Sequence, residues 1–186
     1  MSDAIKENPL KELLGVWEGD KGVDLAPKPD EDENNPYYET LTFEAVDIDI
    51  ENAEEQELRA IRYNQIVREK ANDKVSHDET GFWIWDNEKN TIMCAFSIPR
   101  GVSLLCGGGF EKLHKGETVF KVSAELNHSN WGIVQSPFML QKAKTTSFKR
   151  EVKVVNNTLS YSQETVVEIY GKEFNHKDSN TLTKVG

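Results

Sequence analysis

The fold is indicated by the stretch Leu13-Leu14-Gly15-Val16-Trp17-Glu18-Gly19, and the rest of the chain can be interpreted from it. Before it, leucines at positions 10, 13 and 14 have the spacing of a short helix that begins at Pro9 and ends at Gly15. A helical turn followed by a Gly-x-Trp-x-Gly strand is typical of small ligand-binding barrels, where the turn plugs one end. Trp17 would equally be a buried aromatic between two flexible glycines, so the surrounding pattern has to decide.

The remaining chain predicts a succession of β-strands. Apolar residues alternate in several segments, and Asn156-Asn157 suits the tight turn of a hairpin. About ten strands at a spacing of roughly 8 to 15 residues fit an up-and-down barrel or a sandwich. Closure is favoured because it removes exposed sheet edges. We therefore expect a mainly β protein, a ten-stranded antiparallel barrel of lipocalin-like or fatty-acid-binding-like type with a short N-terminal helix.

The expected domain organisation is simple. Residues 1–8 are polar and predicted to be disordered, and residues 9–186 are predicted to form a single barrel domain, which suits a chain of 186 residues. Three prolines and four acidic residues make residues 26–36 an expected mobile loop, either a lid or without a role. Residues 127–137 and 172–180 are also predicted to be loops, followed by a short closing strand at residues 181–185.

Composition limits the partners of the protein. There are 22 basic and 32 acidic residues, a formal net charge of -10, which repels nucleic acid and anionic membranes. No apolar run reaches the roughly 20 residues of a membrane helix, and the N-terminus lacks a signal-peptide pattern, so we expect a cytoplasmic protein. Cys94 and Cys106 have neither disulfide nor zinc-site spacing. The sequence does not determine the oligomeric state, and it is consistent with a homo-oligomer.

Several motifs occur in an order that resembles the nitrobindin family of haem-carrying, fatty-acid-binding-like barrels. They are Leu-Leu-Gly-x-Trp-x-Gly at 13–19, His-x-Glu-x-Gly at 77–81, Pro-x-Gly at 99–101, Lys149-Arg150, Leu159-x-Tyr161 and Leu182-x-Lys184. The resemblance spans residues 9–185 and implies an internal pocket for haem b. It implies cofactor-binding roles for His176, His77 and Trp17, with His176 as the iron ligand.

Two differences from the family pattern concern this site. The first strand continues as Asp20-Lys21-Gly22 instead of a second Gly-x-Gly, and the proximal-histidine position, counted back from Leu182, falls on Lys177. A shift of one residue turns a strand side chain to the opposite face, so His176 would reach the pocket only if the preceding loop bulges.

Each candidate also has a purely structural interpretation. His176 would be a solvated loop residue, because its neighbours are polar, and His77 would hold a turn and orient Glu79. His114 and His128 are expected to be exposed. Six aromatic residues would line a pocket or equally fill a core, namely Phe82, Trp83, Trp85, Phe96, Phe120 and Tyr161.

Three functions are consistent with the sequence. The first is a barrel that binds a small hydrophobic ligand. The resemblance implies that this ligand is haem b and that the role is nitric oxide binding or peroxynitrite isomerisation, the latter an enzymatic activity only if haem is bound. The second is a haem-free carrier of a lipid-like or other apolar metabolite. The third is a barrel without a ligand that acts through protein contacts. No catalytic constellation of side chains is visible in the sequence.

Overall fold

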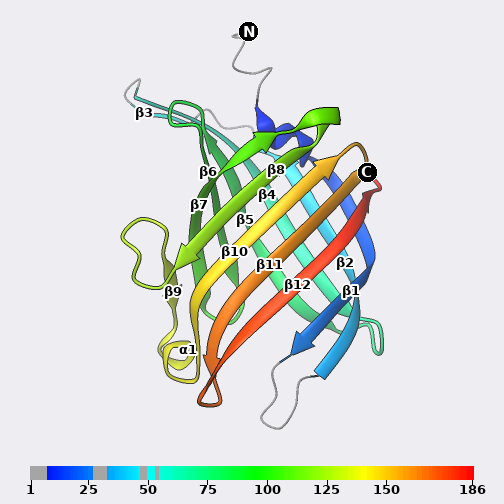
Figure 1. Ribbon diagram of the computed structural model, residues 1–186, viewed down its shortest axis with the longest axis vertical. Helices are drawn as coiled ribbons and strands as arrows, with labels where there is room; N and C mark the ends of the chain where they lie inside the picture. The colour runs from blue at the N-terminus through cyan, green and yellow to red at the C-terminus, as the bar shows by residue number, and fades with distance from the viewer. Residues whose placement is uncertain (1–7, 27–32, 47–49, 53–54) are drawn as a thin grey trace.

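Alternation of apolar and polar residues produces a closed barrel (Figure 1). The computed structural model describes residues 8–26, 33–46, 50–52 and 55–186. In this part of the chain ten antiparallel strands form a ring in the order β2-β1-β12-β11-β10-β8-β7-β6-β5-β4, which closes where β4 pairs with β2. The short strands β3 and β9 pair with β4 and β7 outside the ring. The predicted ten-stranded antiparallel barrel is confirmed.

The ring strands are long enough to cross the barrel obliquely. Their bounds are β1 Gly15–Ala26, β2 Glu33–Ala45, β4 Gln56–Glu69, β5 Val75–Asp86, β6 Thr91–Ile98, β7 Val102–Lys112, β8 Thr118–Glu125, β10 Ala143–Val155, β11 Thr158–Ile169 and β12 Lys172–Lys184. The shorter elements are η2 Pro9–Glu12, β3 Ile50–Asn52, η3 His114–Gly116, β9 Ile133–Gln135 and α1 Pro137–Lys142.

One end of the barrel is closed by the 3-10 helix η2, as the opening motif predicted. The Asn8 side chain caps the helix by accepting from the backbone N–H of Leu10 at 3.0 Å. Leu10, Leu13 and Trp17 are fully buried, and Trp17 Nε1 donates to the Leu13 carbonyl at 2.7 Å. The indole thus ties the helix to the first strand, and this end of the barrel is filled by side chains.

Inward-facing residues form one continuous core. In β6, for example, Ile92, Cys94 and Phe96 are buried and alternate with more exposed neighbours. Cys94 and Cys106 are both free thiols and lie directly opposite each other on β6 and β7. Of the six aromatic residues proposed as lining or core, Phe82 instead faces outward with 38% of its surface exposed. No helix of the described chain is long and apolar enough to cross a membrane.

Three predicted loops are partly strand. Residues 172–180 belong to β12, which pairs with β11 in unbroken register from Thr158↔Thr183 to Ile169↔Lys172. Strands β1 and β2 pair as far as Ala26↔Glu33, so the predicted loop 26–36 is shorter than expected, and residues 27–32 lie outside the described residues. The predicted loop 127–137 contains β9 and leads into α1. In each case the polar composition predicted a loop, but backbone pairing or helix capping forms a strand or a helix instead.

The predicted disordered segment 1–8 is described only at Asn8. The other seven residues lie outside the described part of the chain.

Candidate functional site

A cavity of about 300 Å³ lies inside the barrel at the end opposite η2. It is bounded by the starts or ends of β4, β5, β10, β11 and β12, by the turn between β6 and β7, and by α1. About half of its lining residues are apolar, among them Phe96, Leu104, Met139, Phe148 and Val167. An apolar interior with a few convergent polar groups is the usual composition of a small-molecule site, and this volume lies at the lower end of the usual range.

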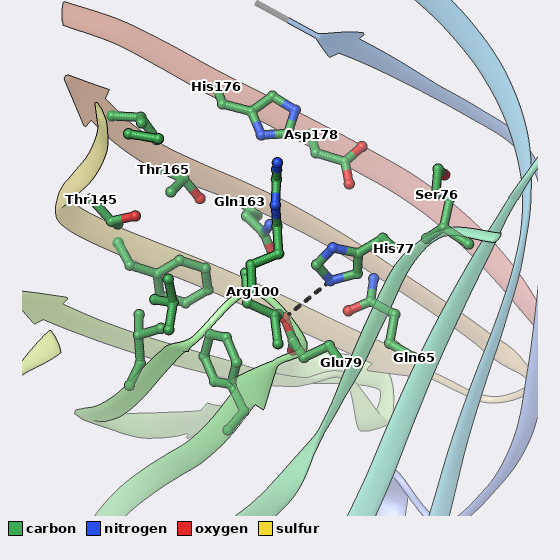
Figure 2. Close-up of a pocket in the computed structure, with 18 of the residues that line it drawn as sticks. Gln65, Ser76, His77, Glu79, Arg100, Thr145, Gln163, Thr165, His176 and Asp178 are labelled. Carbon is green, nitrogen blue, oxygen red and sulfur yellow. Dashed lines mark hydrogen bonds and ion pairs between the residues drawn. The ribbon is translucent and has the colours of Figure 1, made fainter. Parts of the chain in front are cut away.

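His176 lies on the wall of this cavity (Figure 2). The sequence predicted that His176 would face outward unless the chain bulged. Strand β12 has no bulge, and His176 lies on the same inward face as Asn180 and Leu182, which are both buried. Lys177 is exposed on the other face. The His176 ring stacks on Phe174, with ring centroids 6.1 Å apart at an interplanar angle of 26°. The imidazole therefore lies beside the cavity, against the Phe174 ring.

His77 contributes a second imidazole to the same cavity, from the start of β5. Its Nε2 lies 3.4 Å from Oε2 of Glu79, which is 1% exposed. In Figure 2, His77 and Gln65 lie across the cavity from His176 and Asp178, and Arg100 extends from the β6–β7 turn between them. His77 thus has both properties that the sequence left open, a place on the cavity wall and a contact with Glu79.

Glu79 is held by Arg150 of β10 in a buried, two-pronged ion pair. Arg150 Nη1 donates to Glu79 Oε1 at 2.8 Å and Nη2 to Oε2 at 3.2 Å, while the Tyr63 hydroxyl donates to Oε1 at 2.5 Å. Burial alone would raise the pKa of Glu79, but the Arg150 guanidinium and the contact with His77 hold it at about 2. The carboxylate therefore stays ionised in the interior.

The guanidinium of Arg150 also fixes the floor of the cavity. It lies over the rings of Phe96 and Phe148, at 5.2 and 5.1 Å from their centroids. Its Nε and Nη2 donate to Oε1 of Gln163 at 2.9 and 2.6 Å. The Arg150 guanidinium therefore contacts four residues that line the cavity, Phe96, Phe148, Gln163 and Glu79.

A second polar cluster lies on the side of the cavity formed by β2, β4, β11 and β12. Glu39, 2% exposed, accepts from Gln65 Nε2 at 2.6 Å, Asn180 Nδ2 at 2.6 Å and the Tyr161 hydroxyl at 3.1 Å. Burial raises the pKa of Glu39 to about 6, and the nearby charge of Asp178 acts in the same direction.

Asp178 connects this cluster to the cavity that it lines. The Tyr37 hydroxyl donates to its Oδ1 at 2.7 Å, and the Tyr161 hydroxyl lies 3.0 Å from its Oδ2. Gly22 of β1 makes room for the Tyr37 ring, since a Cβ there would lie 2.0 Å from two ring atoms. Gly22 lies directly opposite Tyr37, at the register shift of β1 between Gly19 and Gly22.

The structure separates Trp17 from the two histidines. Trp17 lies at the end closed by η2 and is not among the residues that line the cavity, whereas His77 and His176 line it together. His114 and His128 are exposed, as predicted. The described residues contain no group of three or more histidine, cysteine, aspartate or glutamate side chains that could hold a metal ion by themselves.

Sequence reasoning missed the polar residues that build the cavity walls. Arg150, Glu39 and Asp178 were not proposed as site residues, although a signal was present. Arg150 has the same strand parity as the buried Phe148 and Val152, and Glu39 has that of Tyr37 and Leu41. A charged residue at an inward position of an otherwise apolar strand marks a buried polar site.

The comparisons with known proteins agree with this architecture. The sequence model of a family described as "THAP4-like, heme-binding beta-barrel domain" matches residues 6–184. The chain belongs to this family. Among solved structures, the crystal structure of Rv2717c from M. tuberculosis matches with a TM-score of 0.74 and 18% identity, over 100% of this chain and 99% of that one. At this identity the likeness shows the fold alone. No curated protein matches the chain.

The side chains around the cavity fit the group for which the family is described. A five-coordinate haem needs one imidazole on its iron and an apolar slot for the porphyrin. His176 supplies a ring held by Phe174, and Phe96, Ile98 and Leu104 are among the apolar residues opposite the polar wall. The donor set and the lining are therefore compatible with a haem.

Proposed function

We propose that the cavity binds haem b and that His176 is the protein ligand of the iron. The observation that carries the proposal is the position of the His176 ring, on the cavity wall of a chain from a haem-binding barrel family. Stacking on Phe174 would keep the imidazole in the orientation that binding requires. When bound, haem would supply a Lewis-acidic iron for nitric oxide or peroxynitrite, and only then would peroxynitrite isomerisation be an activity of this protein.

The other residues of the site would bind and orient in support of this role. Phe96 and Phe148, fixed by Arg150, would exclude water from one face of a flat ligand. His77, aligned by the ionised Glu79, would place a second imidazole at the cavity, within reach of a small molecule that enters. Arg100 is exposed at the cavity and would balance negative charge on a ligand.

The test is a titration of the purified protein with ferric haem, followed by absorbance. The wild-type protein and His114→Ala, which changes an exposed histidine of η3 away from the cavity, should give a saturable Soret band. His176→Ala should lose it. A band that persists in His176→Ala but disappears in His77→Ala would assign the iron to the other imidazole and overturn the proposal.

The second candidate is a carrier of an apolar metabolite without iron. It is favoured by one observation, that the wall formed by Tyr37, Gln65 and Asp178 offers hydrogen bonds to a ligand and needs no metal. Native mass spectrometry of the freshly purified protein distinguishes the two candidates. A co-purified lipid-like molecule, together with a broad and non-saturating haem titration that is identical in His176→Ala, would establish the second.

A further inference from the structure

Gln65 presents a carbonyl oxygen to the cavity that no described residue satisfies. The residue is 4% exposed and lines the cavity, and Figure 2 shows its carboxamide beside the His77 ring. Its Nε2 donates to Glu39 Oε1 at 2.6 Å, whereas its Oε1 accepts no hydrogen bond from the part of the chain that the structure describes. No buried side-chain nitrogen or oxygen of the described residues lacks a partner, so this oxygen is open to the cavity, where it is free to accept a hydrogen bond from a ligand.

The orientation of the Gln65 amide depends on the charge of Glu39. An ionised carboxylate only accepts hydrogen bonds, so the amide must turn its NH2 group toward Glu39 and its oxygen toward the cavity. The other oxygen, Glu39 Oε2, accepts from Asn180 Nδ2 at 2.6 Å, and the Asn180 amide cannot turn because its Oδ1 accepts from the Thr181 N–H at 2.8 Å. Oε2 also contacts the Tyr161 hydroxyl at 3.1 Å and so already has two partners, whereas Oε1 contacts Gln65 alone. We therefore place an added proton on Oε1, facing Gln65.

The surroundings of Glu39 make such a proton favourable. Of the described side chains, those that bond it are neutral: Gln65 of β4, Asn180 of β12 and Tyr161 of β11. The titratable groups that face it are Tyr161, Tyr37 of its own strand and Asp178 of β12, and the adjacent β1 contributes Gly19 at this level. Burial without a basic partner, next to a second carboxylate, raises the pKa of Glu39 to about 6.

We propose that Glu39 and Gln65 form a proton-controlled hydrogen-bonding site for the ligand of this cavity. With Glu39 ionised, Gln65 Oε1 accepts from a ligand hydroxyl, amide N–H or ammonium group. With a solvent proton on Glu39 Oε1, the carboxyl donates to Gln65 Oε1, the amide turns over, and its NH2 group donates to a ligand carbonyl or carboxylate. The inference rests on the proposed use of the cavity as a ligand site, and not on haem as that ligand.

The first test follows the side chains by NMR in the protein without haem. Between about pH 5.4 and 7.5, the carboxyl carbon of Glu39 and the side-chain NH2 signals of Gln65 should titrate with one common midpoint near 6. In Glu39→Gln the Gln65 signals should no longer move, whereas in Glu44→Gln, an exposed glutamate of the same strand, they should move as in the wild type. Gln65 signals that do not follow the Glu39 midpoint in the wild-type protein would overturn the proposal.

The second test uses acetophenone, a neutral probe that only accepts hydrogen bonds and does not ionise in this range. Because one hydrogen bond is gained at low pH, the dissociation constant should be roughly 2- to 10-fold lower at about pH 5.4 than at pH 7.5. The difference should vanish in Glu39→Gln and persist in Glu44→Gln. An unchanged affinity in the wild type would contradict the proposal, and neither test depends on whether His176 ligates haem.

Discussion

Arg150 connects the cavity wall to a buried ion pair. It is 6% exposed and pairs with a carboxylate that is 1% exposed, so neither charge can be left alone without a large cost. The same guanidinium contacts two phenylalanines and Gln163 of the cavity lining. Stability and the shape of the site are therefore linked at one side chain.

The first prediction concerns Arg150→Met. This change leaves Glu79 ionised and buried with only Tyr63 and His77 as side-chain partners, so the free energy of unfolding should fall by roughly 3–5 kcal/mol. The pKa of Glu79 should rise, because burial would then dominate. Urea unfolding measures the first effect, and the pH dependence of unfolding measures the second.

Lys149→Met is the matched control for Arg150→Met, since Lys149 is the adjacent residue and faces solvent. It should change the free energy of unfolding by about 0.5 kcal/mol or less. Adding Glu79→Gln to Arg150→Met removes the buried charge and should restore part of the loss. Equal losses in Lys149→Met and Arg150→Met would show that the ion pair does not stabilise the fold.

At the scale of the elements, β12 shows why the site was harder to predict than the fold. The barrel follows from strands with inward apolar residues, such as Ile92, Cys94 and Phe96 of β6, which the sequence displays. In β12 the inward face carries Phe174, His176, Asp178 and Asn180, because it forms the cavity wall. Polar residues on both faces remove the period-two hydrophobic signal on which strand prediction relies.

The same reason explains the other differences between sequence and structure. The sequence placed His176 in a predicted loop, so the direction of its side chain could not be deduced from a strand pattern. The pairing of β12 with β11 shows that it faces inward. Helix α1 had a local signal, Ser136 as a cap and Pro137 at its first position, but it is only 6 residues long. Polar residues that interrupt an apolar pattern are therefore the positions that pattern-based prediction places least well.

The second prediction concerns the bulge of β1. In Gly22→Ala the new Cβ would lie 2.0 Å from the Tyr37 ring, which must shift from the position where its hydroxyl donates to Asp178. We expect a loss of roughly 1–3 kcal/mol in the free energy of unfolding, with a rearranged cavity wall. Thermal or urea unfolding tests the loss, and the NMR signals of Gln65 and Asp178 test the rearrangement.

Gly109→Ala provides the comparison for Gly22→Ala. Gly109 also lies in a strand, β7, but a Cβ there would have no neighbour within 4 Å. The free energy of unfolding of Gly109→Ala should stay within about 0.5 kcal/mol of that of the wild type. If Gly22→Ala were equally harmless, the absence of a side chain at Gly22 would not be needed to make room for Tyr37.

At the scale of the whole molecule, two buried glutamates act in opposite directions on stability. The pKa of Glu79 is about 2 in the folded protein against an ordinary value of 4.5, so its stabilisation is present above about pH 4.5 and lost as the pH falls toward 2. The pKa of Glu39 is about 6 against 4.5, so the folded protein binds the extra proton. Its contribution is present below about pH 4.5 and is lost as the pH rises through 6.

The third prediction follows from the Glu39 shift. Between about pH 4.5 and 6 the free energy of unfolding should decrease with rising pH, by about 2 kcal/mol from this residue. In Glu39→Gln this slope should be reduced, and at about pH 7.5 the variant should be more stable than the wild type by roughly 1–2 kcal/mol. Urea unfolding at a series of pH values measures both effects.

The net charge of -10 gives a second slope of the same sign, because self-repulsion grows as carboxyl groups ionise. Glu44→Gln removes the same charge at an exposed position and therefore reports this general effect alone. Added salt should screen the general effect and leave the Glu39 contribution, since a buried group is screened much less than surface charges. A slope that falls equally in both variants, and disappears in salt, would mean that Glu39 is ionised in the folded protein without cost, and the proton-controlled site would lose its physical basis.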